Sequence, residues 1–428
     1  MSIVINYTIK AEIKREMIYL VLGNHNTLSG VWEQVEITLR TFKEMDLNIS
    51  ISSRIKPGEV NILIEDFSSN LVDSMLKIKA NNPETKYILY VTEYLTQAED
   101  GNFFLNCFNK KSILTRKIFN IEYKLCGDIY NVWQGGDLRS KLKNKIRNFV
   151  APFMHYVAKA SSTNYGNELM MARRQLCLDQ VRELFSLCIS TTEAVLNGYN
   201  TYCDCPLKYL PVFIDEKRVK SNRRKAHHYP AIFFSGRLTP HRKRTSIIFG
   251  KKLLNGYPLE SGAAWQALIK DTKFKLDRLE KETEIFGKSA PKRLANEIRQ
   301  FELPAFDILK TAIYEYTKKN KQAAYEIYIP QSDTWPYSSP NRTVLSIESG
   351  FIPIDYGKFS DHDINKVAIT AHNTDNLNSI LSGQLDTAYK ELDVRIFNYN
   401  NIQGAKIPVV KEAILALCSE SPATWDKN

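Results

Sequence analysis

Cysteine is scarce in this sequence, and its few cysteines are not spaced as metal ligands. The chain of 428 residues holds 7 of them, an odd number without a regular pattern. Cys203 and Cys205 are separated by a single residue, which is too close for a zinc-binding pair. We therefore expect no metal site, and this sparse set fits a protein of the reducing cytosol.

Long apolar runs are also absent. No stretch reaches the roughly 18 consecutive apolar residues that a membrane-spanning helix needs, and Lys10, Glu12 and Lys14 interrupt any signal-peptide core. Glycine and proline, at 18 and 16 residues, follow no period, which excludes collagen-like and low-complexity chains. These absences predict a cytoplasmic protein, for which any membrane contact is peripheral and at the inner face.

The charge that is present is unbalanced. Lysine and arginine number 58 against 47 aspartate and glutamate residues, which gives a formal net charge of +11. The excess favours anionic partners, and nucleotides, phospholipid headgroups, acidic glycans and nucleic acids all stay open on this ground. With 43% hydrophobic residues, the chain has the composition of a folded protein, and its length is enough for two cores.

Short apolar segments alternate with helical patterns along most of the chain, which predicts parallel sheets covered by helices. The expected strands are 17–22, 47–51, 60–64, 87–91, 187–189, 209–214, 231–235, 325–329, 352–354 and 367–369. The expected helices are 31–42, 71–80, 138–158, 169–185, 245–254, 264–285, 290–318, 339–350 and 377–397, and a hairpin is expected within 103–136.

The predicted fold class is α/β, with two Rossmann-like domains that face each other across a cleft. The first domain is 1–215, a polar and basic stretch at 216–229 is the linker, and the second domain is 230–398. Residues 399–428 form a C-terminal segment that is expected to pack back on the first domain. Open α/β sheets bind ligands at the carboxyl ends of their strands, so the loops there are the places to search for chemistry.

The first such loop, 23–30, joins the first strand to the first helix and has a glycine at each end. Glycine allows close backbone approach, and the helix N-terminus offers N–H groups to an anion or a sugar hydroxyl. His25 could act there as a general base. A plain turn with a surface histidine explains the same residues equally well.

Two expected strands end in carboxylates. Glu65 and Asp66 follow the strand 60–64, and Glu93 follows the strand 87–91. Catalytic groups of α/β enzymes lie at such strand ends, so Asp66 and Glu93 are candidate bases. The ends of strands are polar in most proteins, and an ordinary surface role is the alternative.

The sharpest local signal is the segment 233–244, where an apolar strand runs into Gly236 and Arg237 and then into a basic loop with Arg242 and Lys243. Glycine permits a sharp turn, arginine can bind two phosphate oxygens at once, and the following helix start adds donors. The segment predicts a phosphate clamp, with a solvated basic loop as the alternative. It lacks the spacing of a P-loop NTPase.

A second candidate pocket follows the strand 325–329, in a polar loop that leads into the helix 339–350. Hydroxyl and amide donors near the start of this helix could hold an anion. Serine followed by proline is also an ordinary start of a helix, and the two interpretations stay even. The candidate ligand contacts are Ser338, Ser339, Asn341, Arg342 and Glu348.

Taken together, these segments resemble the GT-B nucleotide-sugar glycosyltransferases in a divergent, bacterial-type form. The likeness rests on 188–214 at the expected domain junction, on 233–238 at the start of the second domain, and on 339–354 as a form of the donor-binding helix. Retaining members of that family carry paired glutamates, whereas positions 337 and 345 are tyrosine and leucine here. The anomeric outcome therefore stays open.

The resemblance implies a metal-independent glycosyltransferase without a cofactor. Its second domain would bind the nucleotide-sugar donor, with Gly236 and Arg237 near the phosphates, and its first domain would bind a glycan, lipid-linked or protein acceptor. One of the three candidate bases would take the proton of the acceptor hydroxyl while Arg237 stabilises the departing phosphate. The candidate acceptor contacts are Asn24, Asn26 and Ser29.

Two alternatives belong to other classes. A sugar-nucleotide epimerase-like enzyme could use the same fold. A protein that binds nucleic acid or an anionic surface could use the basic stretches 139–147 and 217–244, but nucleic acid ranks behind because no recognition helix or aromatic platform is visible. The expected helix 138–158 combines an apolar stripe with basic residues and could contact an anionic membrane, unless it simply packs on the core.

Overall fold

The structure is a computed structural model. It describes residues 18–21, 32–52, 54–64, 67–106, 110–126, 152–153, 156–157, 165–225, 227, 229–234, 240–255, 323–329, 340–356 and 363–419. The expected helices 264–285 and 290–318 lie outside these residues, as does most of 138–158. Among the described residues, no helix has the length and apolar character needed to cross a membrane.

The first half of the chain forms a parallel sheet, as the alternation of strands and helices predicts. Its strand order is β2-β1-β3-β4-β7-β8, and each pair of neighbouring strands is parallel. Its strands are β1 (Ile18–Val21), β2 (Ile49–Ser52), β3 (Val60–Ile64), β4 (Lys86–Tyr90), β7 (Phe185–Ser190) and β8 (Leu207–Tyr209). The expected strand 209–214 is wrong in its position, because β8 ends at Tyr209 before Pro211, whose missing N–H cannot extend the ladder.

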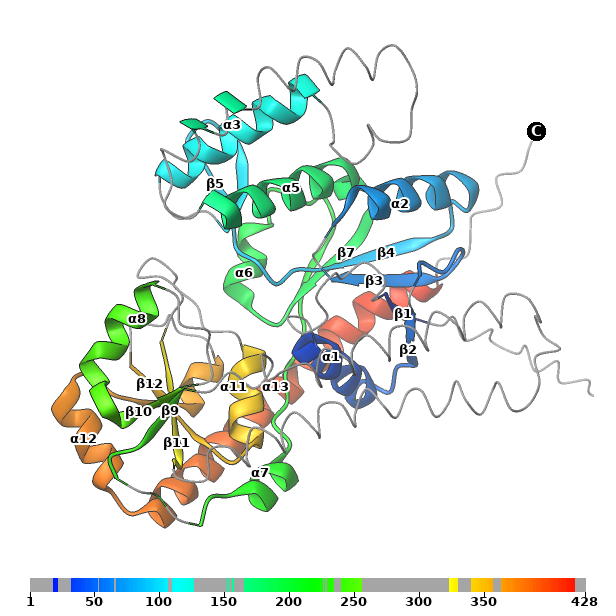
Figure 1. The fold of residues 1–428 in the computed structure, drawn as a ribbon. Coiled ribbons are helices and arrows are strands. Elements are labelled where there is room, and N and C mark those ends of the chain that lie inside the picture. The colour runs from blue at the N-terminus through cyan, green and yellow to red at the C-terminus, as the bar shows by residue number, and fades with distance from the viewer. Residues whose placement is uncertain are drawn as a thin grey trace, which may run out of the picture.

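Helices cover this sheet on both faces (Figure 1). Residues on both faces of its strands are buried. On one face the central strands form an apolar core with the helix that follows β1, and on the other face they form a second core with the helices that follow β3 and precede β7. The helices are α1 (Trp32–Glu44), α2 (Ser69–Asn81), α3 (Lys110–Cys126), α5 (Tyr165–Val181) and α6 (Glu193–Gly198).

The hairpin expected within 103–136 is wrong in its position, because its first strand lies before residue 103 and a helix follows its second strand. Strands β5 (Leu95–Gln97) and β6 (Phe103–Leu105) pair in antiparallel fashion outside the main sheet. Helix α3 follows directly, so the excursion is a hairpin and a helix.

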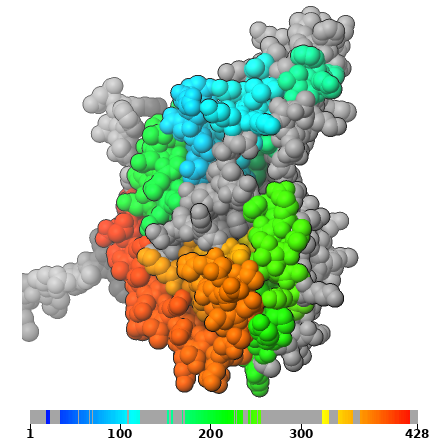
Figure 2. Space-filling model, turned by 90° about the vertical axis from the view of Figure 1, so that its left-hand side faces the viewer, coloured from blue at the N-terminus to red at the C-terminus, as the bar shows by residue number. Residues whose placement is uncertain are grey.

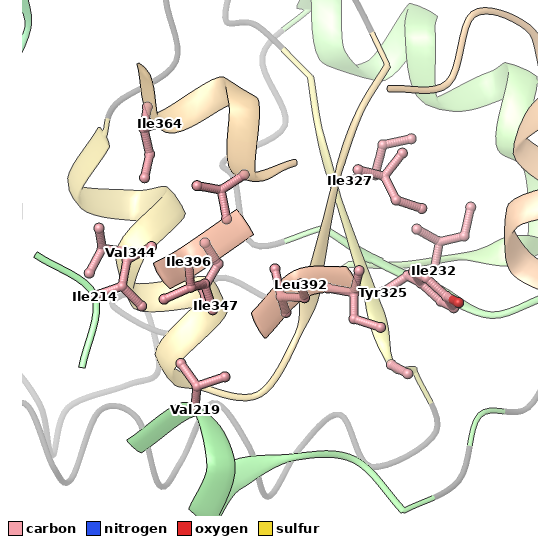
Figure 3. Close-up of a cluster of buried hydrophobic side chains, with 14 of the residues drawn as sticks. Ile214, Val219, Ile232, Tyr325, Ile327, Val344, Ile347, Ile364, Leu392 and Ile396 are labelled. Carbon is pink, nitrogen blue, oxygen red and sulfur yellow. The ribbon is translucent and has the colours of Figure 1, made fainter. Parts of the chain in front are cut away.

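A second parallel sheet is built from the chain after residue 231, in the order β10-β9-β11-β12-β13. Its strands are β9 (Ile232–Phe234), β10 (Leu253–Asn255), β11 (Tyr325–Tyr328), β12 (Ile352–Asp355) and β13 (Ile369–Thr370). Figure 3 shows its core, which includes Ile232 and Ile327 of the sheet and Val344 and Ile396 of the surrounding helices. Both sheets are parallel and are covered by helices, so the fold class is α/β, as the sequence predicts.

The expected helix 245–254 is wrong. Helix α8 (Pro240–Ser246) begins earlier, a 3-10 segment covers Ile247–Lys252, and Leu253 already belongs to β10. Gly250 has a φ of 53°, which ends the helical path and lets the chain turn into the sheet. Lys252 Nζ then donates a hydrogen bond of 2.8 Å to Asn378 of α12 (Thr374–Ser382), and Figure 2 shows these two segments side by side.

Two further elements differ from expectation. The stretch 216–229, predicted as a linker, contains the helix α7 (Glu216–Asn222), whose N-cap Asp215 accepts from the backbone N–H of Lys217 and Arg218. The expected helix 377–397 is two helices, α12 and α13 (Leu385–Ser419), separated at Gly383.

Helix α13 joins the two halves. Its Leu392 and Ile396 pack in the core of the second sheet, whereas its Val410 and Ile414 pack in a core of the first sheet. Figure 1 shows this helix running from one sheet to the other. Asn400 marks the crossing, where its side chain accepts from the N–H of Ile214 at 3.0 Å and donates to the carbonyl of the same residue at 2.9 Å.

Candidate functional site

The strand orders point to the carboxyl edge of each sheet. In both sheets the first strand lies between the second and the third, since β1 is flanked by β2 and β3, and β9 by β10 and β11. Ligands of open α/β sheets bind where the connections diverge to opposite sides, at the carboxyl ends of the strands. The loops that follow β9 and β11 lie outside the described residues, and with them the candidates Gly236, Arg237, Ser338 and Ser339.

Arg242 of α8 is fixed at this edge of the second sheet. Its side chain is buried, its Nε donates a 2.9 Å hydrogen bond to the carbonyl of Ile329 just after β11, and its guanidinium lies 5.3 Å from the ring centroid of Phe234 at the end of β9. The arginine therefore holds a positive charge where two central strands end. The neighbouring candidate Lys243 lies in α8, and its side chain is outside the described residues.

Buried polar side chains gather between the sheet and the helix α11 (Pro340–Glu348). Tyr328 and Asp355 are register partners at the ends of β11 and β12, and Ser346 and Thr343 of α11 lie beside the Tyr328 hydroxyl. All four side chains are buried. Among the described residues, the Tyr328 hydroxyl, Ser346 Oγ and Asp355 Oδ1 have no hydrogen-bond partner. Such groups are costly unless something polar satisfies them.

Burial also raises the pKa of the Asp355 carboxyl to about 7. A carboxyl with such a pKa can exchange a proton near neutral pH, a property that is common at functional sites. Asp355 was not among the residues that the sequence singled out, although it is a carboxylate at the end of a short apolar strand.

Asp355→Asn is expected to change how stability depends on pH. The folded protein keeps the Asp355 proton up to a pKa of about 7, whereas the unfolded chain releases it near the ordinary aspartate pKa of about 4. Wild-type stability therefore falls as the pH rises from about 4 to about 7, by on the order of 4 kcal/mol from this group, and stays level above that range. The variant lacks this fall. Urea unfolding at several pH values measures it, and parallel curves for the two proteins would contradict the assignment.

The start of α11 lies against the carboxyl edge of the first sheet. Asn341 is buried beside the hydroxyl of Tyr90, the last residue of β4, together with Thr191 after β7 and Thr38 of α1. Burial raises the pKa of Tyr90 to about 12, although these polar neighbours lower it in part. The predicted donor-binding helix thus touches the edge where the sequence places the acceptor. Its next residue, Arg342, lies near the Tyr328 hydroxyl.

At the same edge of the first sheet, Glu93 is partly buried. Its Oε1 lies 3.8 Å from Nη1 of Arg174 in α5, and its backbone carbonyl accepts a 3.2 Å hydrogen bond from the Tyr199 hydroxyl. The position after β4 agrees with the strand-end argument, and the arginine favours the charged carboxylate. The other candidates on this side, His25, Asp66, Asn24, Asn26 and Ser29, lie outside the described residues.

The last candidate, Glu348, has protein partners for its carboxylate. The sequence predicts a donor contact there, but the structure buries the side chain, which is only 1% exposed, among Arg40 of α1, Arg218 of α7 and Glu36 of α1. We call these four residues the charge cluster. The carboxylate oxygens of Glu348 accept hydrogen bonds from both arginines and from the Asp215 N–H. In the structure, Glu348 therefore contributes to the contact between helices.

The described residues contain no group of three or more His, Cys, Asp or Glu side chains arranged to hold a metal ion. Comparison of the sequence with protein-family models and with curated proteins gives no match.

Proposed function

We propose that this protein is a glycosyltransferase that moves a sugar from a nucleotide-activated donor to a glycan, lipid-linked or protein acceptor. The observation that supports the proposal is that Asn341 at the start of α11 and Tyr90 at the end of β4 are both buried, with Asn341 among the polar groups that lower the pKa of Tyr90. In the proposed arrangement, the carboxyl edges of the two parallel sheets face each other. Two such edges can hold two substrates with their reacting atoms together, across a cleft between two Rossmann-like domains.

The donor side is the edge of the second sheet. Arg242, with Arg237 and Arg342, supplies positive charge for the donor phosphates, and the N-terminus of α11 adds its dipole. The buried polar groups of Tyr328, Ser346 and Asp355 suit the hydroxyls of a ribose or a sugar, because they can exchange hydrogen bonds with them.

The proposed reaction has the following steps. The acceptor hydroxyl forms a bond to the anomeric carbon of the sugar, the bond from that carbon to the phosphate oxygen breaks, and the nucleotide leaves with the electron pair. The acceptor proton passes to a base on the first sheet, for which Glu93, Asp66 and His25 are the candidates. Arginine side chains stabilise the charge that develops on the leaving phosphate.

A nucleotide should therefore stabilise the protein against heat. UDP, GDP or CMP at about a hundredfold excess over its Kd is expected to add about 2.7 kcal/mol to the free energy of unfolding by mass action. Differential scanning fluorimetry measures the shift in Tm, without and with Mg²⁺ or Mn²⁺. The absence of any shift with all three nucleotides under both conditions would end the proposal.

Arg237→Ala separates a phosphate site from general stabilisation. Loss of a charged hydrogen bond is expected to weaken nucleotide binding by about 1.5–3 kcal/mol, or roughly 10- to 100-fold, in a protein of unchanged Tm. Lys220→Ala is the control, because it removes a cation from an exposed pair with Glu216 on α7. An equal loss in both variants would point to a general effect of charge.

A further inference from the structure

The charge cluster closes a ring between helices of the two halves. Arg40 Nη2 lies 2.6 Å from Glu36 Oε1 and 3.0 Å from Glu348 Oε2. Arg218 Nη1 lies 2.7 Å from Glu36 Oε1 and 3.3 Å from Glu348 Oε2. Each arginine therefore contacts both glutamates, and the charges of the four side chains cancel.

The two glutamates of the ring are deeply buried. Glu36 and Glu348 are 4% and 1% exposed, and Arg40 is 15% exposed. Burial of charge is costly, and an apolar contact of the same shape would often be as stable or more so. What a closed set of charged hydrogen bonds adds is a single allowed geometry, because the pairing is directional and a displaced partner leaves a charge buried alone.

Backbone contacts anchor the ring to the chain that connects the sheets. Arg40 Nη1 donates to the carbonyl of Phe213 at 3.1 Å, and the N–H of Asp215 donates to Glu348 Oε1 at 2.8 Å. The next residue of α1, Thr41, donates its hydroxyl to the carbonyl of Pro211 at 2.7 Å. Helix α1, helix α11 and the segment between β8 and α7 are thus held at one place.

The two helices also connect to the candidate site. Helix α1 follows the loop at the carboxyl end of β1, and α11 follows the loop at the carboxyl end of β11.

We propose that the charge cluster is a joint that couples α1 to α11, so that a displacement of one helix displaces the other. This coupling concerns the two halves of the folded chain and does not depend on which ligand the edges bind. A change in the position of either helix would therefore be detectable in the other helix. A cluster that only stabilises its surroundings would give a local response to each substitution.

Hydrogen–deuterium exchange of the full chain, followed by mass spectrometry, distinguishes the two cases. Glu36→Gln alters the ring from the α1 side and Glu348→Gln from the α11 side, and both remove one negative charge with little change of shape. Each variant is expected to accelerate amide exchange in both helices, 32–44 and 340–348, by about tenfold or more. Glu216→Gln makes the same change in an exposed pair on α7 and is expected to leave both helices unchanged.

Acceleration confined to the substituted helix would overturn the proposal. Equal acceleration in the central strands β3 and β11 would also overturn it, because that pattern indicates general loss of stability. If Glu348→Gln fails to fold, Arg218→Met replaces it. This arginine is 22% exposed, so its loss is easier to accommodate, and the same reciprocal response is expected.

Discussion

Glu348→Ala is expected to lower the free energy of unfolding by about 3–5 kcal/mol, because removal of one partner from a buried ion pair leaves the opposite charge without compensation. The carboxylate of Glu348 receives hydrogen bonds from Arg40, Arg218 and the Asp215 N–H. Alanine removes all of these acceptors and leaves two arginines with a single glutamate. Urea denaturation followed by circular dichroism measures the change.

Two companions test the reason for this loss. Arg40→Met/Glu348→Leu removes one charge of each sign and leaves Glu36 paired with Arg218 at 2.7 Å, so the double variant should be more stable than Glu348→Ala. Lys220→Ala, in an exposed pair, should change stability by less than about 0.5 kcal/mol. A loss below about 1 kcal/mol in Glu348→Ala would show that the buried charges are not coupled as the geometry indicates.

Gly350→Ala is expected to cost about 3–4 kcal/mol of stability, by a different mechanism. Gly350 ends α11 with a φ of +84°, where any Cβ is strained. An added Cβ would also lie 1.9 Å from the backbone oxygen of Asn222 at the end of α7. Because that oxygen belongs to the backbone, α7 and α11 would have to separate, which disturbs the 2.8 Å hydrogen bond from Asn222 Nδ2 to the Glu348 carbonyl.

Gly101→Ala is the matched control. Gly101 has a φ of +79°, nearly that of Gly350, but no atom lies within 4 Å of its added Cβ. This variant should lose only the conformational part, about 1–2 kcal/mol. Thermal and urea unfolding of the two variants side by side gives the difference, and equal losses would show that the contact with Asn222 has no weight.

Much of the fold could be predicted because its signals are local. The strands β3, β4, β11 and β12 are short apolar runs buried on both faces, and such runs stand out in a sequence. Strand β10 was missed, and the helix expected over 245–254 was drawn too far, because the end of the helical segment depends on the conformation of Gly250, which no periodicity records. Helix α7 was missed because its seven residues are mostly polar and hold only one buried apolar side chain, that of Val219.

Less of the candidate site could be predicted, because its signals come from contacts across the chain. Arg242 was singled out through its place beside a strand end and a basic loop, and its binding of a donor stays a prediction. Asp355 was missed because the expected strand stopped at Ile354, although the strand-end argument applies to it equally. The role of Glu348 could not be foreseen, since its partner Arg40 lies 308 positions away in a helix that looks ordinary by itself.

The course of α13 has a consequence for how the chain reaches its native state. Val410 and Ile414 complete a core whose other buried residues lie between Ile18 and Leu210, so this core stays incomplete until the chain has been synthesised as far as α13. Until then, part of the apolar surface of the first sheet stays open to solvent and to other chains. Contacts between segments so far apart along the chain form slowly, and exposed apolar surface favours association in the meantime. The first sheet is therefore an incomplete folding unit during synthesis, and a chaperone that covers its open face would raise the yield of native protein.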